Sequence, residues 1–246
     1  MSQFMVMIHE SEAAEAALGA AETRALLEAR AAYEQSLRLA ASHCDGEHFR
    51  PSAEGRRVRR RDGQLQIDVG PFEEKAFGAY YIVEAPSLDA AVALAQDCPV
   101  APDAEIDVRP LMRGEISPDK ASQQGRVFAF AVLGNALSEQ GWTDVMDRIE
   151  QLGREGRARG GYDEVPGFPD ARRLGGVRLE APGRGRRVAN TGGRRAIFDG
   201  PFLESKEVIG GLFFMHMASL EAAVRWASEK QFIQYGATEI RELWRT

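Results

Sequence analysis

Residues 87–92 read Ser-Leu-Asp-Ala-Ala-Val, and residues 219–224 repeat them as Ser-Leu-Glu-Ala-Ala-Val. Gly-Pro-Phe at residues 70–72 likewise returns at residues 200–202. A repeat this long indicates two copies of one small domain rather than a solenoid of short units.

We expect the first copy at residues 1–113 and the second at residues 126–246. Residues 114–125 are polar and include Pro118, which is typical of a linker. Each copy is long enough to form a core of its own.

Both copies predict the same order of elements: a strand, a long helix, several strands, a shorter helix and a last strand. In the first copy we expect a strand at 4–8, a helix at 22–43, a hairpin around Asp62-Gly63, a strand at 78–84, a helix at 88–96 and a strand at 106–109. The second copy repeats this order from residue 127 to residue 243, and its glycine-rich segment 160–176 reads as a surface loop. Ser87 and Ser219 are the expected N-caps of the two shorter helices.

One side chain interrupts the apolar face of the first long helix. Residues at helical spacing on that face are Leu26, Arg30, Tyr33, Leu37 and Ala40. Apart from Arg30, this face is apolar.

The order of elements predicts an α+β fold with two ferredoxin-like domains of the dimeric α/β-barrel type. Such a sheet has helices on one side only. We expect the two copies to cover each other's second side as an intramolecular pseudo-dimer.

The composition excludes several classes of function. The net charge of −6 argues against a nucleic-acid partner, and we interpret the basic run 56–61 as a solvated hairpin. Cys44 and Cys98 do not form a short CxxC, and no histidine-rich ligand set lies near them, so we expect no structural metal. We see no motif for a cofactor and no apolar stretch that would span a membrane. Two ordinary thiols and the lack of a signal-peptide pattern predict a cytoplasmic protein.

The second copy carries a longer and more specific motif. Residues 199–207 read Asp-Gly-Pro-Phe-Leu-Glu-Ser-Lys-Glu and are followed, after two residues, by Gly210-Gly211. This run resembles the signature of the DGPF branch of the YCII-related family, and the whole chain resembles a tandem duplication of that family.

The resemblance implies a ferredoxin-like domain that pairs into a dimeric barrel with a cleft. Members are mostly small bacterial proteins, a few relatives act on small lactone-type compounds, and many have a proposed acid–base pair of a helix histidine and a strand aspartate. DGPF proteins are also often encoded beside extracytoplasmic-function sigma factors.

The first copy departs from this pattern. Val69 stands where the family has aspartate, with Asp68 one residue earlier. A shift of one residue on a strand turns a side chain to the other face. Neither first helix shows an inward histidine, so at most one acid–base site remains, at Asp199.

Asp199 is the candidate catalytic residue, with the capping of its own turn as the alternative. The candidate ligand-binding residues are His216, Lys206, Arg241, Arg109 and His9. For Lys206 a solvated loop, for His216 a hydrogen-bonded filler and for His9 a surface position are the alternatives. Arg109 and Arg241 are matched between the copies and can pair with carboxylates or hold an anion.

Two functions follow from this reading. The first is a protein that binds a small organic ligand in a cleft between or beside the copies, with enzymatic activity left open. The alternative is a non-catalytic interaction or regulatory module, linked to a sigma factor. Association of the fused pair with further copies stays open.

Overall fold

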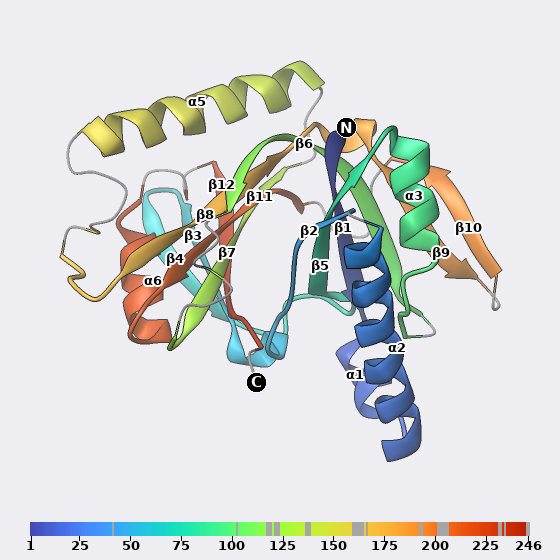
Figure 1. Ribbon diagram of the computed structural model, residues 1–246. Coiled ribbons are helices and arrows are strands. Elements are labelled where there is room, and N and C mark those ends of the chain that lie inside the picture. Colours follow the sequence, from blue (N-terminus) through green and yellow to red (C-terminus); the bar gives the residue numbers. More distant parts are fainter. Residues whose placement is uncertain are drawn as a thin grey trace. The chain divides into compact units, whose positions relative to one another are not determined.

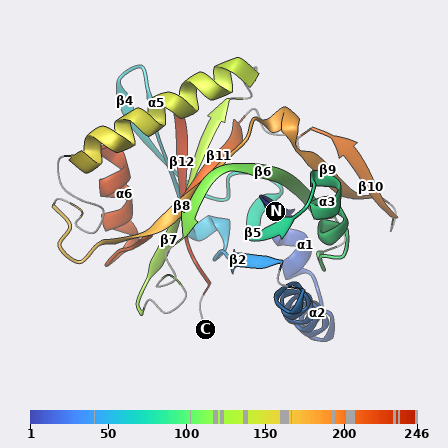
Figure 2. The same cartoon turned by 45° about the horizontal axis from the view of Figure 1, so that its top comes forward.

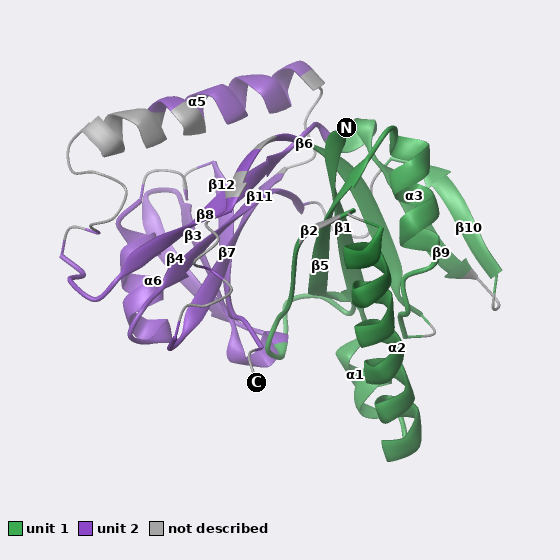
Figure 3. Ribbon diagram, viewed as in Figure 1, with its two compact units in different colours: residues 1–51, 71–111, 182–205 green, residues 52–70, 112–181, 206–246 purple. Residues whose placement is uncertain are grey.

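A computed structural model describes residues 1–40, 42–101, 103–116, 120, 124–135, 139–158, 165, 167–191, 194–200, 207–230, 233 and 235–244. The protein chain forms two compact units, each built from three separate segments (Figure 3). Unit 1 contains residues 1–51, 71–111 and 182–205, and unit 2 contains residues 52–70, 112–181 and 206–246.

Both repeats contain strands and helices in the same overall order (Figure 1). Those of the first repeat are β1 (Ser2–Glu10), α1 (Glu12–Ala16), α2 (Ala20–Leu39), β2 (His43–His48), η1 (Ser52–Glu54), β3 (Arg56–Arg61), β4 (Gln64–Val69), β5 (Ala76–Ala85), α3 (Leu88–Gln96) and β6 (Glu105–Ile116). Those of the second are β7 (Val127–Asn135), α5 (Glu139–Ala158), β8 (Arg172–Leu179), η2 (Pro182–Arg184), β9 (Arg186–Thr191), β10 (Arg194–Asp199), β11 (Glu207–His216), α6 (Leu220–Ser228) and β12 (Gly236–Glu242).

The sheet of unit 1 has the strand order β2-β5-β1-β6-β9-β10, with antiparallel neighbours throughout. Its first four strands, with α2 and α3, follow the βαββαβ order of a ferredoxin-like domain. Unit 2 repeats this arrangement as β8-β11-β7-β12-β3-β4, with α5 and α6. The prediction of two ferredoxin-like α+β domains is confirmed.

Each sheet is completed by a hairpin from the other repeat. The β3–β4 hairpin follows β2 in the first repeat, yet it pairs with β12 in unit 2. The β9–β10 hairpin of the second repeat pairs with β6 in unit 1. The repeats along the sequence and the compact units in space therefore contain different residues.

The exchanged hairpins contribute to both hydrophobic cores. Val188 of β9 is buried with Phe4, Val6 and Ile8 in the core of unit 1. Val58 occupies the equivalent place in unit 2, where its side chain is fully buried. Burial of a valine side chain contributes about 1.5–3 kcal/mol, so each unit depends on the borrowed strand for part of its stability.

The basic run of β3 corrects our interpretation of a solvated hairpin. The hairpin and its Asp62-Gly63 turn are confirmed, with positive φ angles of 50° and 77° at the two turn residues. Arg57, however, is only 6% exposed, because β3 is paired on both sides and its alternate side chains face the interior of unit 2.

Two other elements differ from the prediction. The first long helix ends at Leu39, and residues 43–48 form β2 because they pair with β5. Residues 172–176 belong to β8 rather than to a surface loop. Gly176 is required there by close packing, since a Cβ at this position would lie 2.7 Å from the carbonyl oxygen of Leu212.

The repeated Gly-Pro-Phe motif needs its glycine for a different reason in each copy. At Gly70 a Cβ would lie 1.9 Å from the carbonyl oxygen of Ser52, so only glycine fits. At Gly200 the space is open, but φ is +85°, a conformation that glycine adopts without strain. Pro201 and Phe202 lie outside the described residues.

Both predicted N-caps are confirmed. The hydroxyl of Ser87 accepts a hydrogen bond from the backbone N–H of Ala90, and Ser219 accepts one from Ala222. We expect Ser87→Ala and Ser219→Ala each to lower the free energy of unfolding by about 1 kcal/mol. Urea unfolding measures this loss, and Ser87→Asp, which keeps a cap acceptor, should restore most of it. An unchanged midpoint in the alanine variants would contradict the capping role.

In the part of the chain that the structure describes, no helix combines the length and the apolar character needed to cross a membrane.

Candidate functional site

The sheet of unit 1 has one apolar side and one charged side. Phe4, Val6 and Ile8 of β1 face the core beneath α2 and α3. Because side chains alternate along a strand, Met5, Met7 and His9 face the other side. The register of β1 with β6 places Arg109 beside Met5, Asp107 beside Met7 and Glu105 beside His9.

His9 and Asp107 form a pair on this second side. His9 Nε2 lies 3.7 Å from Asp107 Oδ2, and the two side chains are 13% and 9% exposed. The His9 ring also packs against the Phe77 ring, with centroids 5.6 Å apart. An imidazole held beside a carboxylate can exchange a proton with a bound molecule.

Cations surround this pair. Glu105 binds Lys75 Nζ at 2.8 Å through Oε1 and Arg187 Nη1 at 3.2 Å through Oε2. Arg109 is 2% exposed, and its stem packs closely on Gly185, where a Cβ would lie 2.6 Å from Arg109 Cγ. We call the set His9, Lys75, Glu105, Asp107, Arg109 and Arg187 the charged row.

Unit 2 has a related network without a histidine. Glu239 and Arg241 occupy the places of Asp107 and Arg109, and Leu133 occupies the place of His9. Arg57 of β3 binds Glu239, with Nη2 2.7 Å from Oε2, and Arg241 Nη1 binds the other oxygen at 3.1 Å. In both units an arginine of the borrowed hairpin thus binds an acid of the host sheet, which indicates a structural role for these ion pairs. His9 is an additional member of the network in unit 1.

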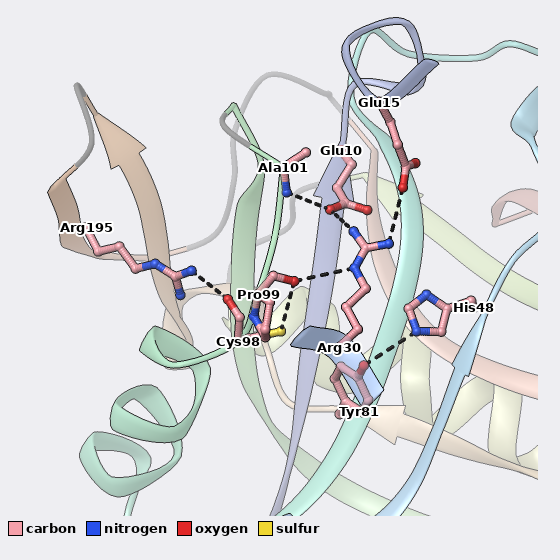
Figure 4. A network of polar contacts seen from close by, with 9 residues as sticks. All are labelled: Glu10, Glu15, Arg30, His48, Tyr81, Cys98, Pro99, Ala101 and Arg195. Atoms are coloured by element: carbon pink, nitrogen blue, oxygen red, sulfur yellow. Dashed lines mark hydrogen bonds and ion pairs between the residues drawn. The ribbon is translucent and has the colours of Figure 1, made fainter. Parts of the chain in front are cut away.

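A second polar cluster lies on the helix side of unit 1 (Figure 4). Arg30 of α2 is buried, binds Glu10 at the end of β1 and reaches Glu15 with Nη1–Oε1 3.2 Å. Glu10 Oε1 also accepts the backbone N–H of Ala101 at 3.2 Å. Burial raises the pKa of Glu10, and the Arg30 guanidinium partly opposes that shift.

His48 and Tyr81 extend this cluster (Figure 4). His48 Nε2 lies 3.5 Å from the hydroxyl oxygen of Tyr81. The ring of Tyr81 packs edge-on against the ring of Tyr33. Burial and, secondarily, the charge of Arg30 lower the pKa of His48 to about 4, so the ring is neutral at pH 7. Burial raises the pKa of both tyrosines. A base this weak is poorly matched to proton transfer near neutral pH.

Arg195 of the borrowed hairpin caps the C-terminus of α3 in the same unit. Its guanidinium donates to the carbonyl oxygens of Ala95, Gln96 and Cys98. Burial raises the pKa of the Cys98 thiol to about 12, which makes this thiol unreactive at neutral pH. In unit 2 Arg60 of β3 similarly donates to the carbonyl oxygen of Ser228, at the end of α6.

The helix side of unit 2 is aromatic instead. Phe213 stands at the place of Tyr81 and stacks on Phe130 with ring centroids 4.7 Å apart. Trp226 packs edge-on against both rings. The titratable cluster is therefore a property of unit 1.

The structure places the predicted catalytic residue on the surface of unit 1. The side chain of Asp199 is 90% exposed, and its Oδ1 lies 2.8 Å from Nε of Arg186 on the neighbouring strand. This is the geometry of a surface ion pair. A catalytic role for Asp199 stays a prediction.

The predicted ligand-binding residues are divided between the units. His9 and Arg109 lie on adjacent strands of unit 1, whereas Arg241 and His216 lie in unit 2. His216 Nδ1 lies 3.0 Å from the carbonyl oxygen of Asp170, and Gly125 packs against its ring. Lys206 lies outside the described residues.

The sequence analysis missed Glu10, His48 and Asp107. Arg30 did leave a signal, because it interrupts an apolar helical face at the spacing of Leu26 and Tyr33. Asp107 left no such signal in the sequence, because His9, its neighbour in space, lies 98 residues earlier in the chain (107 − 9). Among the described residues, histidine, cysteine and acidic side chains form no group of three or more that would hold a metal ion.

These observations define a duplicated ferredoxin-like α+β protein with exchanged hairpins. The model of the YCII-related domain matches residues 2–114 and 131–246, so the chain belongs to the YCII-related family as a tandem duplication. Membership of the DGPF branch stays a prediction from residues 199–207.

Among solved structures, the chain is similar to one described as "Putative Chlorite dismutase TA0507". The two are 10% identical with a TM-score of 0.39, and the similarity covers 100% of this chain and 96% of that chain. No curated protein matches this chain at a significant level.

Proposed function

We propose that unit 1 binds a small organic anion on the charged side of its sheet, at His9 and Asp107. The observation that carries this proposal is the His9–Asp107 pair at 3.7 Å, which has no histidine counterpart in unit 2. Buried ion pairs that only join a hairpin to a sheet do not need an imidazole. The corresponding ion pairs of unit 2 form without one.

The neighbouring charges favour an anionic ligand. Lys75, Arg109 and Arg187 supply three positive charges, against the two carboxylates Glu105 and Asp107. A ligand carboxylate would balance the remaining charge and receive a hydrogen bond from His9. The low exposure of the pair strengthens such contacts, because they form away from bulk water.

Small hydroxy acids, which are the ring-opened anions of lactones, are the first compounds to test, since the family resemblance pointed to lactone-type compounds. In this assignment His9 exchanges a proton with the ligand oxygen, and Asp107 orients the imidazole. Binding alone satisfies the proposal, and turnover would be a further result.

NMR of the histidine rings tests it directly, because the chain contains four histidines. We expect compounds that bind to shift the His9 ring nitrogens and to lose that effect in Asp107→Asn. His9→Gln should abolish binding, measured by thermal shift and calorimetry, while His216→Gln in unit 2 should leave it unchanged. Binding that survives His9→Gln at full strength would refute the site. A fold check by circular dichroism distinguishes lost binding from lost structure.

A cytoplasmic location, the absence of a nucleic-acid partner and a link to a sigma factor stay predictions. They are independent of His9 and need cell fractionation and purification of complexes.

A further inference from the structure

β4, the second strand of the arginine-rich hairpin (cyan in Figure 2), is the last strand in the order of the unit 2 sheet. Within the described part of the chain, β4 pairs with β3 and with no other strand. All six of its residues are exposed. An edge strand of this kind can pair with another extended chain.

The register of the hairpin shows which backbone groups β4 presents outward. Arg61 and Gln64 flank the two-residue turn, so they form a hydrogen-bonded pair, and such pairs alternate along the hairpin. The bond from Gly70 N to Gly55 O confirms this alternation at the other end. Leu65, Ile67 and Val69 therefore direct their N–H and C=O groups away from β3.

The same three residues form an exposed apolar stripe. Leu65, Ile67 and Val69 alternate along β4, so their side chains lie on one side of the sheet, and they are 41%, 46% and 61% exposed. An added strand would thus find hydrogen-bonding groups and apolar side chains at the same three positions.

The equivalent strand of unit 1 is protected. The residues of β10 at these positions are Arg195, Ile197 and Asp199. Arg195 binds the end of α3, and Asp199 binds Arg186. Charged side chains are a common way to prevent pairing at a sheet edge. The exposed apolar stripe therefore distinguishes β4 from its own duplicate.

The charges around the stripe indicate what kind of chain fits. Arg56 and Arg60 of β3 lie opposite Val69 and Leu65, on the same side of the sheet as the stripe. Arg61 is exposed at the turn. A second copy of this chain carries a net charge of −6 but offers basic residues at its own β4 hairpin. A separate acidic segment has better charge complementarity.

We propose that β4 is a docking strand for an extended segment of a partner protein in which acidic and apolar residues alternate. The segment would add to the sheet of unit 2 beside β4, with its apolar residues on the stripe and its carboxylates near the arginines of β3. This inference is independent of His9 and of ligand binding in unit 1.

A synthetic peptide tests the proposal on the full chain. The probe is fluorescein-labelled Glu-Val-Glu-Val-Glu-Val-Glu, followed by fluorescence anisotropy. Two control peptides are the same sequence with lysine in place of glutamate and the same sequence with a central proline. We expect the acidic peptide to bind and both controls to fail, because one has the wrong charge and the other cannot form a continuous strand.

Ile67→Pro removes one outward N–H without removing a bond to β3, so the hairpin can tolerate it. We expect this variant to weaken binding of the acidic peptide about tenfold or more. Ile197→Pro makes the matched change in β10 and should have no effect. Ile67→Ser is a second variant that keeps the backbone and removes the apolar contact without adding a charge, and it should also weaken binding.

Three results would overturn the proposal. The first is equal binding of the acidic and lysine peptides, and the second is equal loss in Ile67→Pro and Ile197→Pro. The third is a concentration-dependent dimer, seen by light scattering without peptide and abolished by Ile67→Pro, which would make a second copy the occupant. Failure of the proposed function at His9 would leave all of these measurements interpretable.

Discussion

Replacing Glu239 with alanine should lower the free energy of unfolding by about 3–5 kcal/mol. Glu239 is 6% exposed and binds two buried guanidinium groups, those of Arg57 and Arg241. Its removal takes this acid away from Arg241, and Arg57 keeps a longer contact, 3.6 Å from its Nη1 to Oε2 of Glu207. Breaking a buried pair costs this much because the remaining charge stays desolvated.

Glu242→Ala is the matched control on the same strand. Glu242 Oε2 lies 2.6 Å from Arg126 Nη2, a shorter distance than either contact of Glu239. The Arg126 side chain is 46% exposed, so we expect a loss of at most about 1 kcal/mol. Urea unfolding of Glu239→Ala and Glu242→Ala compares the two losses in the free energy of unfolding. Similar losses would show that burial does not set the strength of these ion pairs.

His48 should make the protein less stable as the solution becomes acidic. Its folded pKa of about 4 lies below the ordinary value of 6.5, so between these values the unfolded chain binds more protons than the folded one. Stability from the neutral ring is complete above pH 6.5 and is lost as the pH falls to about 4. This difference in pKa corresponds to about 3 kcal/mol in the free energy of unfolding. Solvent screening of the half-buried ring reduces that contribution to about 2 kcal/mol.

Urea unfolding of the natural protein and of His48→Gln from pH 7 to pH 4 isolates this effect. Glu10 titrates with the opposite sign, because its raised folded pKa makes it stabilising below its ordinary value of 4.5 and less so as the pH rises. Taking the difference between the two proteins removes that contribution. Identical pH profiles for His48→Gln and the natural protein would contradict the assignment.

Local patterns in the sequence predicted the elements well. Asp62-Gly63 predicted the hairpin, and Ser87 with the apolar spacing after it predicted α3. These signals depend on turn geometry and capping, which neighbouring residues determine. The ferredoxin-like order followed from placing such elements in sequence.

Long-range pairing could not be predicted in this way. The pairing of β3 with β12 places Val58 opposite Thr238, and no local pattern distinguishes β12 from β6 as the partner of β3. The same applies to the site. His9 was a candidate from the sequence, but its pairing with Asp107 depends on the register of β1 with β6. Arg30 stood out in the sequence as an exception on an apolar helical face, but its buried partner Glu10 could not be read from that pattern.

The exchange of hairpins sets the order in which the chain can fold during its synthesis. The part of β6 that belongs to unit 1 ends at Leu111, but the β9–β10 hairpin that completes its sheet ends at Asp199, which is 88 residues later (199 − 111). At about 5–20 residues per second, the ribosome needs about 4–18 s to deliver it. Until β9 has been made, residues 105–108 of β6 lack the strand that pairs with them in the folded unit. Residues 105–108 of β6 can therefore reach their final pairing only after most of the chain has been made.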